Sequence, residues 1–510
     1  MKQFTQPFIF FAFFSFFVFS GCKKPNDGVE PIINPTISES SVSIRLIDAR
    51  NNEEIKNSTV SIIGDDANLI FDNSGERPSI VEEGFLELIP VSSIEPSNSR
   101  PIRFSIKVEK EGYFSTLAPI TIYKKGNQTI EIKLINKSKL VNGAGFTEKT
   151  YTLGSDQTLQ QEEVLTAIPS NNGSGKAEVT IYKGSVFKDA NNVPIKGNLK
   201  VELAYFNHLD DAVAAFPGGL EATTENNENI VFKSAGLVSL KMQQDSDGKI
   251  VKNISKPITM NITIPVGSTD SENKPIVVGT PIPIWSLNEI NGKWKNEGTA
   301  TVIEENGELH AKFEMNHLSY WNLDFKRNAC NLGTTLKFQS SITKDYYTAA
   351  TLKFSDGTTR FIYLNLKNGD ETTLRNAPEG LSAELDLPEP FNTTFKINSL
   401  CSGTTVLTLN TALPSPIKVS IIGKCGTKVV KWPTLSVYAK EISGANRWEY
   451  IGQMVGGNFE TSKLKLGKTY VFGTFYKELI KSDEITIDKT TYQVTKTLSA
   501  TSKACGILTK

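Results

Sequence analysis

The sequence offers few residues that could perform acid–base or metal chemistry. It contains three histidines, His208, His310 and His317, and histidine is the side chain whose unperturbed pKa best suits proton transfer near neutral pH. The nearest arrangement to a metal site is His208-Leu-Asp-Asp211 with His310 or His317 downstream, because imidazoles and a carboxylate are zinc ligands. We favour the alternative that His208 lies on a loop after a strand and that His317 packs beside Trp321.

The spacing of these residues is similar to that of the zinc ligands of carboxypeptidases, but Asp replaces Glu and the chain lacks the α/β pattern of those enzymes. HExxH and Gly-x-Ser-x-Gly motifs are absent, and Gly173-Ser-Gly-Lys176 lacks the rest of a phosphate loop. We therefore expect no enzyme, no cofactor and no metal. A zinc-dependent or other hydrolase with a site in residues 137–328 is the alternative.

Aromatic residues are the other candidates for a site. Trp285 and Trp294 lie on two expected strands joined at Asn291-Gly292, whose residues accept the positive φ of a tight hairpin. Their rings, like that of Trp321, either pack in the core, which we favour, or face solvent and stack on a sugar. Trp285, Trp294 and Trp321 are the residues we would name for ligand contact.

The amino-terminal residues have the plan of a secretory signal. Lys2 is followed by the apolar run Phe8 to Phe19 and by Ser20-Gly21-Cys22. A run of about 12 residues is too short to span a bilayer, which needs roughly 20. Residues 1–21 are therefore expected to be a signal peptide.

The junction Phe19-Ser20-Gly21-Cys22 resembles the lipobox of bacterial lipoproteins. That resemblance implies cleavage before Cys22 and its acylation, with palmitate or similar chains fixing the protein to the outer membrane. An ordinary signal peptide with a coincidental cysteine is the alternative. Residues 22–40 are rich in Pro, Asn, Ser and Glu and are expected to be a flexible tether. The tether is too generic to decide between the cell surface and the periplasmic face.

Composition excludes one class of partner. The 510 residues carry 55 Lys+Arg and 55 Asp+Glu, so no basic field exists to attract nucleic acid. The partners we expect are the membrane, through the lipid, and an unknown protein or glycan.

Four further cysteines are confined to the last third of the chain: Cys330, Cys401, Cys425 and Cys505. Disulfides are the expected state in an oxidising compartment. Of the three possible pairings we favour Cys330–Cys401 with Cys425–Cys505, because each pair would bracket one expected domain. A zinc site is the rival interpretation, but no CxxC or nearby His supports it.

The elements that would position these residues are short strands. Between residues 41 and 136, runs such as 41–47, 59–63, 102–108 and 129–134 alternate apolar and polar residues and are bounded by Asn, Asp, Gly or Pro, which is typical of a β-sandwich. Val60-Ser-Ile62, Gly84-Phe85 and Gly112-Tyr113 resemble landmarks of the carboxypeptidase-regulatory-like, transthyretin-like sandwich. In that family the module is an accessory without catalytic residues.

The remaining chain is also strand-rich. Residues 137–328 form a larger β-rich region, in which Phe216-Pro-Gly-Gly219, Ser234-Ala-Gly236, the Trp285 to Trp294 segment and His317 to Asn322 resemble the extracellular sandwich region of cartilage intermediate layer protein. Two further sandwiches are expected at 329–412 and 413–510. The sequence thus predicts an all-β chain of tandem immunoglobulin-like or transthyretin-like sandwiches, and a non-catalytic lipoprotein that binds or scaffolds.

Overall fold

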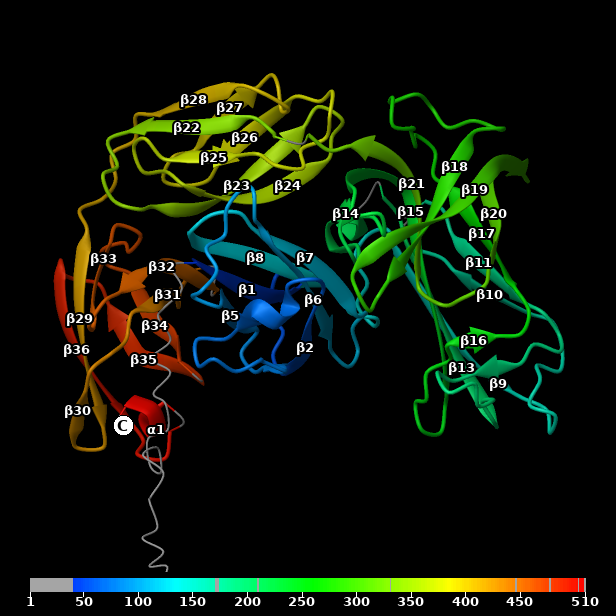
Figure 1. Ribbon diagram of the computed structural model, residues 1–510, viewed down its shortest axis with the longest axis horizontal. Coiled ribbons are helices and arrows are strands. Elements are labelled where there is room, and N and C mark those ends of the chain that lie inside the picture. Colours follow the sequence, from blue (N-terminus) through cyan, green and yellow to red (C-terminus); the bar gives the residue numbers. More distant parts are fainter. Residues whose placement is uncertain are drawn as a thin grey trace, which may run out of the picture.

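A computed structural model describes residues 40–508 apart from 170–173, 209–210, 331, 445–446, 477 and 503. The expected signal peptide, Cys22 and residues 23–39 of the expected tether lie outside the described residues, whereas Ser40, the last residue of that tether, already belongs to the first strand. The fold is all-β, as predicted, and its strands fall into four consecutive groups that share no hydrogen-bonded sheet. We call these groups the first, second, third and fourth sandwich (Figure 1). No described helix is long and apolar enough to cross a membrane.

The first sandwich has two four-stranded sheets, ordered β3-β5-β1-β8 and β4-β2-β6-β7. Val42, Ile44 and Leu46 of the first strand are buried in the core between them, whereas the alternate residues Ser43 and Arg45 belong to the opposite face, as the two-residue period of a strand requires. Its elements are β1 (Ser40–Asp48), β2 (Ser58–Ile63), the 3₁₀ turn η1 (Ala67–Leu69), β3 (Ile70–Phe71), β4 (Ile80–Val81), β5 (Phe85–Pro90), β6 (Ile102–Glu109), β7 (Thr116–Ile122) and β8 (Gly126–Leu134).

The second sandwich is built on an eleven-stranded sheet that folds over its own core. Its long strand β19 pairs with β18 through its first part and with β20 through its last residues, which joins the two layers. Its elements are β9 (Ala144–Thr152), β10 (Glu163–Ala167), β11 (Ala177–Ile181), β12 (Phe187–Lys188), β13 (Asn198–Phe206), η2 (Asp211–Ala215), β14 (Glu221–Thr223), β15 (Asn229–Gln244), β16 (Asn253–Ile254), β17 (Ile258–Ile264), β18 (Pro281–Asn288), β19 (Lys293–Glu305), β20 (Glu308–Met315) and β21 (Tyr320–Asn328).

The third and fourth sandwiches each pack two sheets around a separate core. The third consists of β22 (Thr335–Ser340), β23 (Tyr347–Phe354), β24 (Thr359–Asn365), β25 (Glu371–Thr373), β26 (Ala383–Leu387), β27 (Thr393–Ile397) and β28 (Thr404–Leu409). The fourth consists of β29 (Ile417–Cys425), β30 (Lys428–Val430), β31 (Leu435–Glu441), β32 (Trp448–Met454), β33 (Asn458–Thr461), β34 (Thr469–Tyr476), β35 (Glu478–Thr486), β36 (Thr491–Leu498) and the short helix α1 (Cys505–Leu508).

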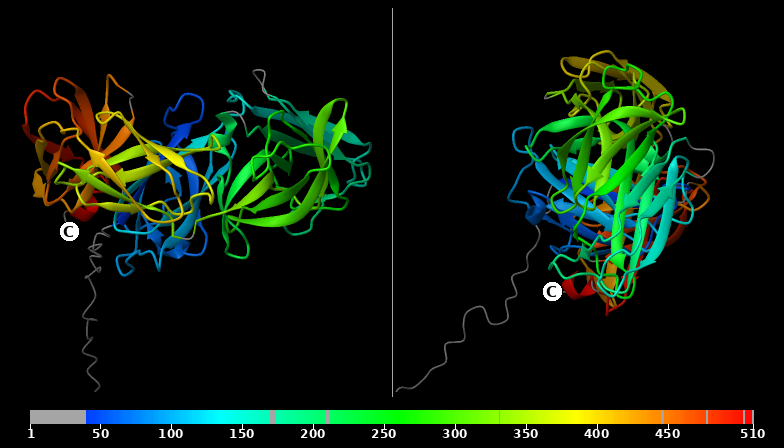
Figure 2. Two further views of the ribbon diagram at one scale, coloured as in Figure 1. Left: turned by 90° about the horizontal axis from the view of Figure 1, so that it is seen from above. Right: turned by 90° about the vertical axis from the view of Figure 1, so that its right-hand side faces the viewer.

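The first sandwich is the centre of the molecule. In Figures 1 and 2 it lies between the fourth and the second sandwich, with the third alongside it. Tyr438 of the fourth sandwich reaches the hydroxyl of Ser43 at 2.5 Å, and Tyr320 of the second donates to the carbonyl of Ser115 at 2.6 Å. Lys124 donates to the carbonyl of Glu371 in the third sandwich at 2.9 Å. The four sandwiches therefore form one packed assembly instead of an extended string.

The hairpin that carries Trp285 and Trp294 forms as predicted, but its turn differs. β18 and β19 pair in register up to Asn288 and Lys293, and only Gly292 of the expected Asn291-Gly292 pair has a positive φ, of 75°. A four-residue connection allows Asn291 to stay at negative φ, because the tight two-residue turn that needs two positive angles is not used.

Candidate functional site

A cavity of about 2520 Å³ lies between the four sandwiches and is lined by residues from each of them. The first sandwich contributes β8 and the segment before it, and the third contributes β23 and β24. The second sandwich closes one part of the cavity with the residues around β14 and β15, and the fourth closes another with those around β32. We call this space the interdomain cavity.

Ion pairs fix the second sandwich against the third at the cavity wall. Arg327 donates to Asp356 at 2.6 Å, and both side chains are buried, with 7% and 3% exposed. Arg360 contacts Glu221 at 2.6 Å. Burial raises the pKa of Asp356, but hydrogen bonds from Thr358 and the charge of Arg327 outweigh this effect, so its pKa lies below the usual value. These carboxylates are therefore engaged in holding two sandwiches together.

The first, third and fourth sandwiches meet at a second polar wall. Arg45 and Glu131 of the first sandwich form an ion pair, and Tyr363 of the third lies beside them with its pKa raised to about 12 by burial. Lys463 of the fourth sandwich donates to the carbonyl of Tyr450 at 2.6 Å. Burial lowers the pKa of Lys463 to about 8, as expected for an ammonium group removed from water.

Three cations that line the cavity lie over aromatic rings instead of against carboxylates. Lys133 is 5.6 Å from the ring centre of Phe361, Arg375 is 5.0 Å from that of Tyr123, and Lys463 is 5.4 Å from that of Tyr346 and 5.8 Å from that of Tyr450. Within the part of the chain that the structure describes, none of the three makes an ion pair. A cation over a ring keeps several donors free, so these groups can bind a negatively charged ligand.

The three histidines occupy unrelated environments. His208 follows β13 and lines the cavity; burial lowers its pKa to about 4. His310 on β20 is buried with Nδ1 3.1 Å from Asn261. His317 stacks on Trp321 with ring centres 4.8 Å apart, which confirms the packing that we favoured. Among the described residues no three His, Cys, Asp or Glu side chains gather where a metal could bind, and Asp211 lies in the turn η2.

The tryptophans are core residues. Trp285, Trp294 and Trp321 are 6%, 1% and 2% exposed, and Phe232 lies against both Trp285 and Trp294 with ring centres 5.3 Å away. The alternative that these three rings form a ligand-contact surface is wrong for this structure, because a buried ring offers no face on which a sugar can stack. Among the described residues, the large exposed aromatic side chain is that of Phe361, at 61%, which lines the cavity from β24.

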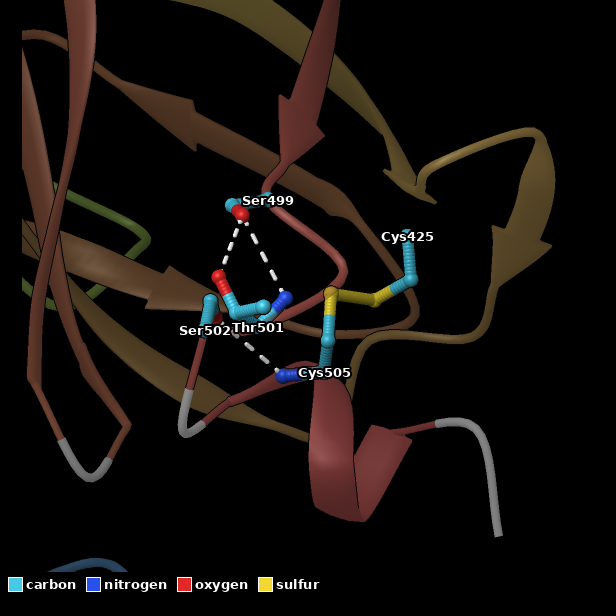
Figure 3. The surroundings of a disulfide bond; sticks show 5 residues. All are labelled: Cys425, Ser499, Thr501, Ser502 and Cys505. Atoms are coloured by element: carbon cyan, nitrogen blue, oxygen red, sulfur yellow. Dashed lines mark hydrogen bonds between the residues drawn. A yellow bond between two sulfur atoms is a disulfide. The ribbon is translucent and has the colours of Figure 1, made fainter.

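The structure contains the two disulfide bonds that the sequence favoured. Cys330 pairs with Cys401 and Cys425 with Cys505, with Cα atoms 4.8 and 5.6 Å apart. Figure 3 shows Cys505 at the start of α1, bonded to Cys425 at the end of β29. Each bond closes its own sandwich, so the two carboxyl-terminal sandwiches are each cross-linked within themselves.

Comparison with known proteins adds little. No family model matches the chain. Solved structures with weak similarity include the shaft pilin SpaA of Lactobacillus rhamnosus GG, at 8% identity over 32% of this chain and 97% of that one, with a TM-score of 0.18. Another is the major pilin subunit of Bacillus cereus, at 10% identity over 90% of this chain and 99% of that one, with a TM-score of 0.14. Similarity this low carries no argument about function.

Proposed function

We propose that this chain is a non-catalytic lipoprotein of the bacterial envelope, anchored to the outer membrane through acylated Cys22, which binds a ligand in its interdomain cavity. The observation that carries the proposal is the cavity itself, about 2520 Å³ and lined by all four sandwiches. Its volume exceeds the roughly 300–1,000 Å³ of a small-molecule pocket, so it suits a segment of a polymer or of another protein.

The packing of the sandwiches supports a preformed binding site. Arg327 with Asp356 and Lys440 with Glu54 are ion pairs between sandwiches at 2.6 and 2.8 Å, and each has little exposed side chain. Such contacts fix the cavity walls before a ligand arrives, which lowers the entropic cost of binding. Asp356 and Glu221 line the cavity and each pair with an arginine of another sandwich, and we assign neither of them to catalysis.

The anchor and the modules complete the proposal. The lipobox-like junction at Cys22 supplies the membrane attachment, and residues 41–136, with their carboxypeptidase-regulatory-like landmarks, form an accessory module at the centre of the assembly. We propose 137–328, 329–412 and 413–510 as the other domains, the first of them similar to the sandwich region of cartilage intermediate layer protein. The protein faces either the cell surface or the periplasm.

One experiment tests the binding site. Ala349 lies on β23 and lines the cavity, so Ala349→Trp places a large ring inside it. Immobilised mature protein is exposed to envelope and culture-medium fractions, and the retained molecules are compared among wild type, Ala349→Trp and the control Val429→Trp, whose position is 70% exposed and outside the cavity. We expect wild type and the control to retain molecules that Ala349→Trp does not retain. Equal retention by all three would contradict the proposed site.

A second experiment tests the anchor. Intact cells are treated with protease, and the amino-terminal peptide around Cys22 is then analysed by mass spectrometry. An acylated Cys22 is expected; digestion of the sandwiches would place them on the cell surface, and protection would place them in the periplasm. An unmodified Cys22 would contradict the anchoring.

A further inference from the structure

The edge of β8 faces the interdomain cavity. β8 pairs with β1 and is the last strand of its sheet. The consecutive residues 123–131, together with Lys133, line the cavity. Because successive side chains of a strand point to opposite faces, an unbroken run of residues can border one space only when the edge of the strand is turned toward it. The cavity therefore meets a row of backbone N–H and C=O groups.

No described strand pairs with this edge. Across the cavity lies β24, which pairs with β23 alone, and among the described residues no backbone hydrogen bond joins β8 to β24. The two are linked by side chains: Lys133 lies over the ring of Phe361, and Tyr363 forms a hydrogen bond with Thr129. An unpaired strand edge is a template for another extended chain. This one lies inside the cavity between the four sandwiches, which limits its contact with other chains.

Positive groups stand near both ends of the edge. Arg375 lies over Tyr123, just before β8, and Lys133 is near its far end. The seven residue steps from Gly126 to Lys133 span about 23 Å at 3.3 Å per residue, the length of an extended peptide of about seven to nine residues. Neither cation makes an ion pair with a described carboxylate, so the track complements a strand with acidic side chains toward its ends.

A cation already lies over one face of Phe361, Tyr123 and Tyr346, so a sugar could stack only on the opposite face of each of these rings. The backbone groups of β8, by contrast, match the alternating donors and acceptors of a peptide.

We propose that β8 accepts an extended, acidic peptide segment of a partner protein as an added strand. This inference rests on the proposed function, because it names the ligand class of the same cavity. Backbone hydrogen bonds to β8 supply the affinity, and Arg375 and Lys133 select acidic side chains at the two ends of the segment.

A display library of nine-residue peptides tests the proposal on the full mature protein. Peptides with Asp or Glu fixed near both ends are compared with peptides that carry Lys there and are otherwise randomised. Enrichment of the acidic set is expected. The best peptide should lose at least tenfold in affinity on Lys133→Glu/Arg375→Glu. It should be unaffected by Lys428→Glu/Lys431→Glu, a charge reversal at exposed positions outside the cavity.

Two further measurements separate strand addition from simple charge attraction. N-methylation of every second amide of the peptide keeps its charges but removes those N–H donors. Alternate amides of a strand point to opposite edges, so only one of the two alternate sets faces β8. Methylation of that set should reduce binding at least tenfold, whereas methylation of the other should not. Bound peptide should also slow amide hydrogen exchange within residues 126–133. Binding that is indifferent to methylation in both registers would overturn strand addition, even if it depends on charge.

The outcomes distinguish this inference from the proposed function. If no peptide is enriched on the wild-type protein relative to the Lys133→Glu/Arg375→Glu protein, the peptide proposal is wrong. If acidic oligogalacturonate then binds wild type but not Ala349→Trp, the cavity is still a binding site, for a glycan. If neither probe binds and Ala349→Trp retains the same envelope components as wild type, both proposals fail.

Discussion

Arg327 Nη1 donates a 2.6 Å hydrogen bond to Asp356 Oδ2 across the junction between the second and third sandwiches. Both side chains are buried, and Thr358 donates to the other carboxylate oxygen at 2.6 Å. The pair lies at the wall of the interdomain cavity, so the interaction that joins two sandwiches also shapes the space between them.

Replacement of Arg327 should lower the free energy of unfolding substantially. Arg327→Met leaves the Asp356 carboxylate buried without its counter-charge, and a loss of about 3–5 kcal/mol in the free energy of unfolding is expected, measured by urea denaturation. Lys337→Met, which breaks an exposed pair with Glu371, is the control and should cost about 0–1 kcal/mol. Similar losses for the two variants would contradict the structural role of the buried pair.

Glu87 should make stability fall as pH rises. Burial raises its pKa, and hydrogen bonds from Ser436 and Asn73 only partly oppose this. A carboxyl with a raised folded-state pKa contributes stability fully below its unfolded value near 4.3, and the contribution is lost as pH rises through the folded value. Urea unfolding between pH 4 and 8 should therefore show a smaller decline for Glu87→Gln than for wild type. The exposed control Glu384→Gln should retain the wild-type slope; an unchanged slope in Glu87→Gln would contradict the assignment.

His208 should titrate at a lower pH than an exposed histidine. Burial, aided by the charge of Lys233, lowers its pKa to about 4, so its contribution to stability is present above the unfolded value near 6.5 and is lost as pH falls from 6.5 toward 4. The imidazole proton signal that disappears in His208→Gln should titrate near 4 in NMR spectra. A midpoint near 6.5 would contradict the burial of His208, and one equivalent of zinc bound by wild type and lost in His208→Gln would favour the hydrolase alternative.

The two disulfides should stabilise their sandwiches separately. Cys425 and Cys505 are separated by 80 residues and Cys330 and Cys401 by 71, and closing loops of this size contributes up to about 4 kcal/mol in the chain-entropy model. Paired Cys→Ala variants should each lower the free energy of unfolding. Mass mapping of non-reduced peptides should find these two pairings; a peptide linking Cys401 to Cys425 would contradict the structure.

Trp294 and Phe361 should differ sharply in their effect on stability. Trp294→Ala removes a ring that is 1% exposed and packed on Phe232, for an expected loss of about 3–5 kcal/mol. Phe361→Ala removes one that is 61% exposed and should cost less than about 1 kcal/mol. Thermal and urea unfolding of both variants measure this difference, and equal losses would contradict the burial assigned to the two rings.

The strands could be predicted because their alternation is local. The predicted runs 41–47, 59–63 and 129–134 fall within β1, β2 and β8, since strands with clear boundaries carry their pattern in a few residues. The disulfide pairs followed from their positions around the expected domains. The sequence alone could not decide whether the three tryptophans are buried or exposed. A ring on a strand can face the core or the solvent without any change in the local sequence.

The cavity could not be predicted because it depends on how separate sandwiches pack. Ser43 and Tyr438 meet although 395 residues separate them, and no local pattern encodes such a contact. Glu87 illustrates the limit: its alternation within β5 assigns it to the face away from the core of the first sandwich, yet the fourth sandwich buries it. The cations Lys133 and Arg375 likewise look like ordinary surface charges in the sequence.

Site-specific photo-crosslinking in living cells tests most directly whether the interdomain cavity binds the ligand. A photoreactive phenylalanine is introduced at Ala349 inside the cavity, and at the exposed position Val429 as the control. Ligand binding in the cavity predicts a discrete, light-dependent adduct at position 349 and none at 429. Adducts at 429 with none at 349 would contradict it and place the binding surface outside the cavity.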